Sequence, residues 1–79
     1  MAKTHELKII PKYFKDVVDG DKNFELRKND RNFKVGDSLM LKEFDHGAYT
    51  GDSGQVVVTY ILVGGEYGLN KDYVILGIE

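Results

Sequence analysis

Three charged side chains that could take part in chemistry lie close together, just after a turn-forming glycine at position 20: Lys22, Glu25 and Arg27. A lysine ammonium is a compact charge suited to a phosphate or a carbonyl oxygen. A carboxylate can accept protons from a base amino group or act as a general base, and an arginine can clamp a phosphate or stack on a base. These residue types predict a ligand-binding site. If the protein is an enzyme, Lys22 and Glu25 are the candidate catalytic residues.

The spacing of these residues indicates how a strand would orient them. Side chains alternate along a strand, so Glu25 and Arg27 would share one face, about 6–7 Å apart. Phe24 and Leu26 would share the other face, which we predict enters the core. Each residue also has a purely structural alternative. Lys22 could be a solvated loop lysine, and Glu25 could form an ion pair with Arg27 or with Lys22. Both roles can hold together, because an arginine that orients the glutamate would also support a site.

The composition is that of one small domain, which we place at residues 1–79. The 42% hydrophobic content is enough for a single core. The absence of cysteine excludes disulfides, thiolate metal sites and a cysteine nucleophile. No apolar run approaches the ~20 residues of a membrane helix, and the N-terminus lacks a signal-peptide core. We therefore expect a cytoplasmic protein with no membrane partner.

The charge is distributed unevenly along the chain. Residues 1–42 hold ten basic and seven acidic side chains, whereas residues 43–79 hold one basic and six acidic side chains. Such asymmetry hints at a charged ligand, although a solvated surface of mixed charge is an equal alternative. Lys28 and Arg31 follow the central motif and are expected to assist in ligand binding. His5 and His46 lie far apart without a third ligand, so we predict no metal site and no cofactor.

Hydrophobic periodicity predicts one helix and five strands. The helix begins at Pro11, carries an apolar stripe of Tyr13, Phe14, Val17 and Val18, and ends before a left-handed Gly20. The expected strands are 5–9, 23–28, 38–44, 55–63 and 72–78, with tight turns at 29–30 and 33–37, a long flap at 45–54 and a loop at 64–69. The fourth strand is apolar on both faces, which places it at the centre.

This pattern predicts an α+β, mainly β fold. Mostly antiparallel strands at short spacing favour a small β-barrel of about five strands with one helix packed against it. Closure would protect the apolar fourth strand from edge pairing. Two tyrosines expected in loops, Tyr49 and Tyr67, could stack on a base in place of packing in the core.

Residues 20–27 fit the pattern Gly-x-Lys-x-x-Glu-x-Arg, which resembles the signature of ASCH domains, relatives of the PUA fold. The segments 5–8, 27–31, 33–37, 58–62 and 73–76 extend the resemblance to a small bacterial and phage branch, most of whose members have no known function. The resemblance implies a PUA-like β-barrel with a cleft beside the helix-to-strand turn. It implies RNA or a modified nucleotide as the ligand, held by Lys22, Glu25 and Arg27 with Lys28 and Arg31.

The same resemblance raises an enzymatic alternative. Some ASCH proteins resemble amidohydrolases of acetylated cytidine, which use a lysine corresponding to Lys22, a threonine at the position of Glu25 and a later glutamate that has no match here. The missing threonine removes the proposed nucleophile, so a binding module is favoured over a hydrolase of an acylated nucleoside. A third alternative is a protein-interaction module that uses the acidic second half, including Asp45 and Asp52. The sequence does not define an oligomeric state.

Overall fold

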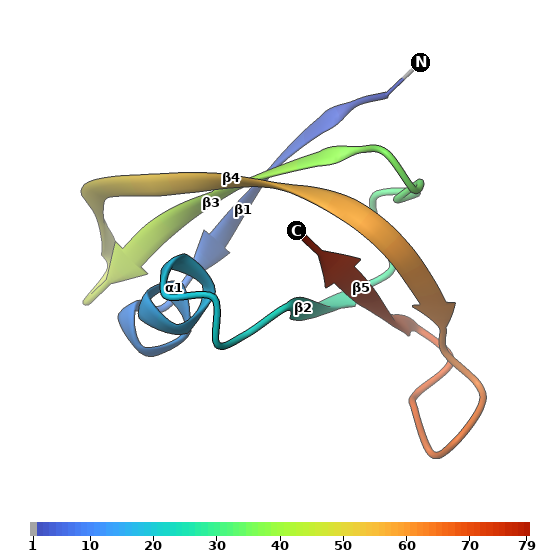
Figure 1. Cartoon of the computed structure of the whole chain (residues 1–79). Coiled ribbons are helices and arrows are strands. Elements are labelled where there is room, and N and C mark those ends of the chain that lie inside the picture. The colour runs from blue at the N-terminus through green and yellow to red at the C-terminus, as the bar shows by residue number, and fades with distance from the viewer. Residues whose placement is uncertain (1) are drawn as a thin grey trace.

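The computed structural model describes residues 2–79, so residue 1 of the predicted domain lies outside the described chain. The elements are β1 (Thr4–Ile9), α1 (Pro11–Val18), β2 (Phe24–Lys28), β3 (Ser38–Asp45), β4 (Ala48–Val63) and β5 (Tyr73–Ile78). The molecule is a small, compact α+β structure made mainly of sheet, which confirms the predicted class (Figure 1). Within the described residues, no helix is long and apolar enough to cross a membrane.

The five strands form one sheet in the order β1-β3-β4-β5-β2. The β1–β3 pair is parallel and the other three pairs are antiparallel. The central position predicted for β4 is confirmed. The edge strands β1 and β2 do not pair with each other, so the predicted closed barrel is not confirmed. We call the region between these two edge strands the seam.

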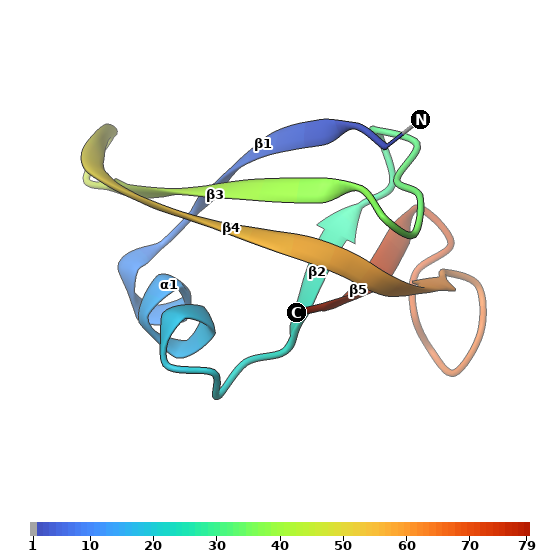
Figure 2. The same ribbon diagram turned by 45° about the horizontal axis from the view of Figure 1, so that its top comes forward.

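The strand β4 is long and strongly bent, and it belongs to both halves of the sheet (Figures 1 and 2). Sixteen residues would span about 50 Å if straight, whereas the longest dimension of the molecule is 34 Å. The first part of β4 pairs with β3 and the last part with β5. The register passes from Val58 opposite Ile78 to Tyr60 opposite Gly77, which makes Thr59 the extra residue of a bulge. Bulges increase the local bend of a strand, so this one helps β4 to curve.

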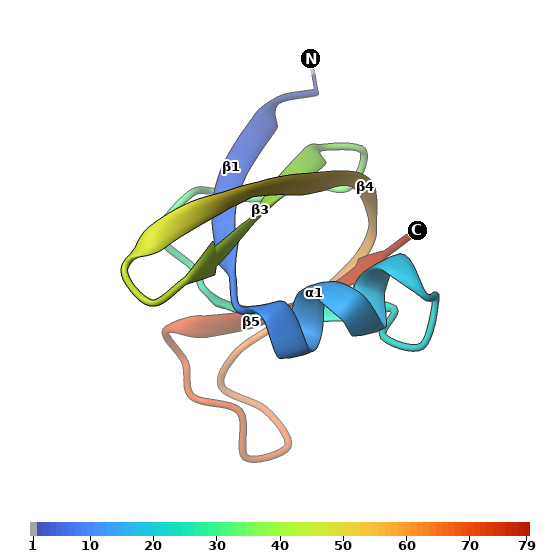
Figure 3. The same ribbon diagram turned by 90° about the vertical axis from the view of Figure 1, so that its left-hand side faces the viewer.

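The core lies on the concave side of the bent sheet. Its buried apolar members come from β1, β3, β4 and β5 and from one loop: Leu7, Ile9, Phe33, Leu39, Leu41, Val58, Val74, Leu76 and Ile78. The helix α1 lies across one end of the molecule, below β1, β3 and β4 in Figure 3. Phe14 and Val17 pack against the core, whereas Tyr13 and Val18 are exposed, so only half of the predicted helical stripe is covered. Gly20 has the predicted left-handed conformation, with φ +81°.

The hairpin between β3 and β4 corrects one prediction. Residues 45–54 were expected to form a long flap, but the chain turns at His46 and Gly47 alone, and Asp45 pairs directly with Ala48. Both turn residues have positive φ, 49° and 82°, as a two-residue hairpin turn of the primed type requires. Strand β4 therefore begins at Ala48 instead of at the predicted position 55.

The predicted tight turn at 33–37 is present, and it ends in a buried carboxylate. The backbone N–H of Asp37 donates to the carbonyl of Lys34, and the turn residue Gly36 has φ +96°. The Asp37 carboxylate accepts hydrogen bonds from the backbone N–H groups of Lys3 and Lys34, each at 3.0 Å, and from His5 Nε2 at 2.8 Å. The hydrogen bond from Lys3, followed by that from His5, lowers the pKa of Asp37 to about 2. This network joins the start of β1 to the start of β3.

Candidate functional site

The two faces of β2 are reversed relative to the prediction. Phe24 and Leu26 are 48% and 52% exposed, whereas Glu25 is only 2% exposed. The pairing with β5 explains this result, because Glu25 lies opposite Leu76 and Arg27 lies opposite Val74. Both β5 partners belong to the core, so the charged pair points to the concave side. The prediction that the charged residues share one face is confirmed, and the prediction that the apolar pair enters the core is wrong.

Lys22, Glu25 and Arg27 converge into what we call the charged triad. Arg27 Nε and Nη2 donate to Glu25 Oε1 at 2.9 and 2.6 Å, and the Lys22 ammonium donates to Glu25 Oε2. The side chains of Lys22 and Arg27 are 15% and 22% exposed, so both cations still reach solvent. The glutamate therefore fixes the positions of two cations. The structure thus contains the ion pairs that the sequence analysis gave as an alternative, and it also brings the three residues together at one place.

The charged triad lies at an open pocket of about 460 Å³, which we call the aromatic pocket. Its lining comes from the end of β1, the start of α1 and strand β2: Lys8, Ile9, Ile10, Tyr13, Lys22, Phe24, Glu25, Leu26 and Arg27. The Lys22 ammonium lies 5.3 Å from the ring centroid of Tyr13 and 5.1 Å from that of Phe24. Both rings are nearly half exposed. The pocket thus combines two accessible aromatic rings with two fixed cations.

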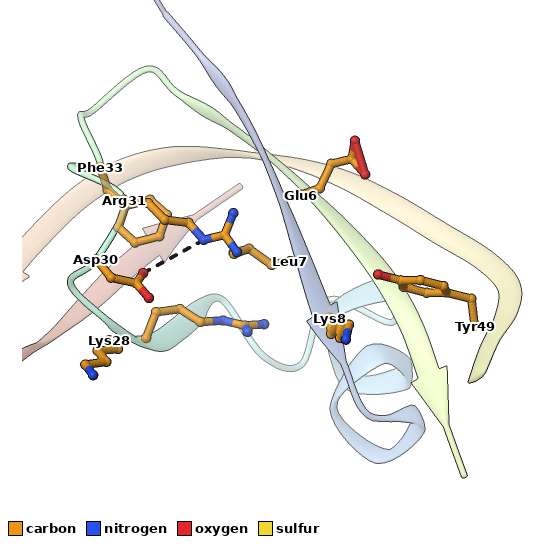
Figure 4. A pocket seen from close by; sticks show the side chains of 9 residues that line it. Glu6, Leu7, Lys8, Lys28, Asp30, Arg31, Phe33 and Tyr49 are labelled. Carbon is orange, nitrogen blue, oxygen red and sulfur yellow. Dashed lines mark ion pairs between the residues drawn. The ribbon is translucent and has the colours of Figure 1, made fainter. Parts of the chain in front are cut away.

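A second pocket, of about 380 Å³, also has Arg27 in its lining, and we call it the basic pocket (Figure 4). It is lined by Glu6, Leu7, Lys8, Arg27, Lys28, Asp30, Arg31, Phe33 and Tyr49. Lys8 and Arg27 line both pockets. Figure 4 shows the Arg31 side chain extending from the segment after β2 toward β1. The two pockets therefore lie next to each other along the seam.

Positive charge dominates the basic pocket. The carboxylate of Glu6 contacts the Lys42 ammonium at 2.6 Å, and this hydrogen bond holds the pKa of Glu6 below its usual value. Asp30 Oδ1 lies 3.8 Å from Arg31 Nε, which is an ion pair too long for a hydrogen bond. Within residues 2–79, Lys8 and Lys28 have no carboxylate at ion-pair distance. Each acid of the pocket is thus offset by a cation, and two further cations remain.

The structure brings all five predicted site residues to these two pockets. Lys22 and Glu25 line the aromatic pocket, Lys28 and Arg31 line the basic pocket, and Arg27 lines both. Their predicted roles in ligand binding or catalysis remain predictions. Both oxygens of Glu25 are engaged by cations, so a general-base role would require one of those cations to move. In the described part of the chain, no group of three or more His, Asp or Glu side chains could hold a metal ion.

The aromatic residues of the site differ from those that the sequence indicated. Tyr49 lies in β4 instead of in a loop, lines the basic pocket and packs edge-to-face on Phe44 at 5.2 Å. Tyr67 does lie in a loop, but it is 94% exposed and lines neither pocket. Tyr13 and Phe24 were expected to pack in the core. The position of Phe24 two residues after Lys22 is a sequence signal for its place in the site, whereas no local signal indicates Tyr13.

Comparison with known proteins gives a family without an assigned activity. Residues 4–78 match the family described as domain of unknown function DUF3850. An uncharacterized 12.9 kDa protein in the GpA 3′ region of Escherichia phage P2 is 41% identical over 76 residues, covering 96% of this chain and 68% of the phage protein. The match spans both edge strands, the helix and all five predicted site residues. The chain therefore belongs to the DUF3850 family.

Proposed function

We propose that this protein is a binding module for RNA or a nucleotide, with the base held in the aromatic pocket. The observation that carries the proposal is the charged triad beside two accessible rings. Glu25 holds Lys22 and Arg27 in the pocket lining, beside the partly exposed rings of Tyr13 and Phe24. Every nucleobase has a flat face that can stack on such a ring, and the attached phosphates are attracted by the cations.

The ASCH resemblance supports this proposal from the sequence side. The Gly-x-Lys-x-x-Glu-x-Arg motif at residues 20–27 runs from the end of α1 into β2, which is where the resemblance implies a ligand cleft. We propose that the chain is an ASCH-like, PUA-related domain of bacterial or phage origin that acts in the cytoplasm. Its β-barrel would then be an open one, in which the seam provides the ligand cleft.

Binding is favoured over hydrolysis by the state of Glu25. A glutamate that activates water needs an accessible oxygen, but Oε1 accepts two hydrogen bonds from Arg27 and Oε2 accepts one from Lys22. The side chain is also 3% exposed. This arrangement suits a residue that orients cations better than one that abstracts a proton. Lys22 is similarly occupied, which weakens its case as a catalytic group.

The proposal can be tested by titrating the protein at low salt with nucleosides, nucleotides and short RNA oligomers while recording amide NMR shifts. We expect shifts for residues 13 and 22–27. Tyr13→Leu and Phe24→Leu remove a ring face from partly exposed positions, and stacking is worth about 1–3 kcal/mol per base, or roughly 5- to 150-fold in Kd. Tyr67→Leu is the matched control, because it removes an exposed ring that lines neither pocket.

Two results would contradict the proposal. The first is an absence of shifts at residues 13 and 22–27 with every ligand at low salt. The second is an equal loss of affinity in Tyr67→Leu and in the two pocket variants. A panel of acylated nucleosides added to the same samples tests the hydrolase alternative, because product formation that depends on both Lys22 and Glu25 would favour an enzyme.

A further inference from the structure

We infer that the basic pocket binds the phosphate group of the same nucleotide whose base occupies the aromatic pocket. This inference rests on the proposed function, and it assigns the base and the phosphate of one ligand to two different pockets along the seam. The two pockets share Lys8 and Arg27 in their linings, so one ligand can extend from one pocket into the other. The ligand class is a base joined through its sugar to a phosphate, either as a free nucleotide or as one unit of a strand.

Arg27 is placed to contact both parts of such a ligand. Its Nε and Nη2 donate to Glu25, and the remaining nitrogen, Nη1, makes no hydrogen bond to the described chain. The guanidinium is planar and its donors point in fixed directions. With one edge held by Glu25, the remaining donors are held in fixed directions for a ligand. Arg27 can therefore orient a phosphate without first losing the entropy of a mobile side chain.

The other cations of the basic pocket are available to an anion. Arg31 Nε is 3.8 Å from Asp30 Oδ1, so a phosphate oxygen at hydrogen-bond distance would compete successfully with that carboxylate. Lys28 is exposed and has no carboxylate partner within residues 2–79. Lys8 lies 4.4 Å from the ring centroid of Phe44, which holds its ammonium beside the pocket. These three side chains therefore present positive charge to a phosphate group from both sides of the seam.

The two pockets differ in a way that fixes which part of the ligand each one takes. The aromatic pocket has the apolar side chains of Ile9, Ile10 and Leu26 beside its rings. A phosphate there would lose hydration against apolar surface and would compete with Glu25 for its cations. A cation in the basic pocket is disfavoured, because Glu6 is already bound by Lys42 and Asp30 faces Arg31. The base therefore belongs with the rings and the phosphate with the exposed cations.

The test compares each Kd for a nucleoside with that for its monophosphate by calorimetry or NMR titration. We expect the monophosphate to bind about tenfold tighter or more, the gain expected from one or two charge-assisted hydrogen bonds. In the Lys28→Gln/Arg31→Gln variant the ratio of the two Kd values should fall toward about one. The control variant Lys15→Gln/Lys71→Gln also removes two exposed positive charges, but it lies outside both pockets and should keep the wild-type ratio.

The outcomes separate this inference from the proposed function. If nucleosides bind but the monophosphate gains nothing, or if the Lys28→Gln/Arg31→Gln variant keeps the gain, the inference is wrong and the proposed function stands. If no nucleoside, nucleotide or oligomer binds, both the proposed function and this inference are wrong. They would remain wrong even if inorganic phosphate alone shifted the amide signals of residues 28–31. A dinucleotide that binds several-fold tighter than the monophosphate would identify a strand as the source. Equal affinities would identify a free nucleotide, and either result supports the inference.

Discussion

At the scale of single residues, Glu25 is the most informative position in the chain. It is a carboxylate on the concave face of an edge strand, beside the fully buried Leu76, and such a group is stable there only if its charge is compensated. Lys22 and Arg27 provide the compensation from either side. The sequence could predict that these residues meet. It could not predict that the carboxylate points inward, because that direction depends on the pairing of β2 with β5.

The first prediction concerns Glu25→Gln. The amide keeps the size of the side chain but leaves two neighbouring cations without an anion, and it offers a donor where Glu25 accepts. We expect a loss of roughly 1–3 kcal/mol in the free energy of unfolding, the usual cost of leaving a buried polar partner unsatisfied. Urea unfolding would measure it, with Glu66→Gln in the exposed loop as the control. Equal stability of the two variants would mean that the triad does not contribute to folding.

At the scale of elements, local signals predicted most strands and the helix. The proline at the start of α1, the glycine after it and the β-branched run of β4 each act within a few residues, so the sequence reveals them. The turn at His46 and Gly47 was missed because its signal is only two residues long and was masked by several polar turn formers that follow it. The faces of β2 were misassigned because an edge strand beside an open seam can leave its apolar side chains partly exposed.

The loop between β4 and β5 carries the second prediction. A Cβ at Gly64 would collide with the carbonyl oxygen of Asn70 and lie 2.5 Å from that of Tyr73. Backbone atoms cannot move aside as the end of a side chain can, so Gly64→Ala should lower the free energy of unfolding by about 1–3 kcal/mol or more. Gly68→Ala is the comparison: its φ is +79° but the space is open, so only the cost of the left-handed conformation applies, about 1–2 kcal/mol. Thermal unfolding of both variants would measure the two losses of stability, and we expect the larger loss in Gly64→Ala. A larger loss in Gly68→Ala would contradict this prediction.

At the scale of the whole molecule, the candidate site is made by elements that are distant in sequence. β1 and the helix start contribute one side of the seam and β2 with the following segment contributes the other. The sequence predicted the β2 side from its motif, but it gave no sign that Lys8 and Tyr13 would face that motif. A similar long-range pair, His5 and Asp37, was also missed, because 32 residues separate the two partners.

Acid stability of the whole fold is the third prediction, and it rests on Asp37. Its pKa is about 2 in the folded protein against an ordinary value of 3.8, so the folded state binds fewer protons than the unfolded state in this range. The stabilisation is complete above about pH 4 and is lost as the pH falls toward 2. We expect the urea midpoint of the wild type to drop across that window. Asp37→Asn should be less stable at neutral pH and should show a shallower drop, and parallel profiles would contradict this role.

The bulge at Thr59 has a mechanical consequence for the seam. Because β4 is shared by both halves of the sheet, its curvature sets how far apart the two edge strands stand on the opposite side of the molecule. That curvature is adjusted where Gly77 faces the bulge, since a Cβ there would lie 3.2 Å from both Thr59 Oγ1 and Tyr60 Cβ. A single methyl group at Gly77 would thus press against the bulge and would change the local bend of β4. Gly77 and Thr59 line neither pocket, so a change at either position would reach the pockets only through the curvature of β4.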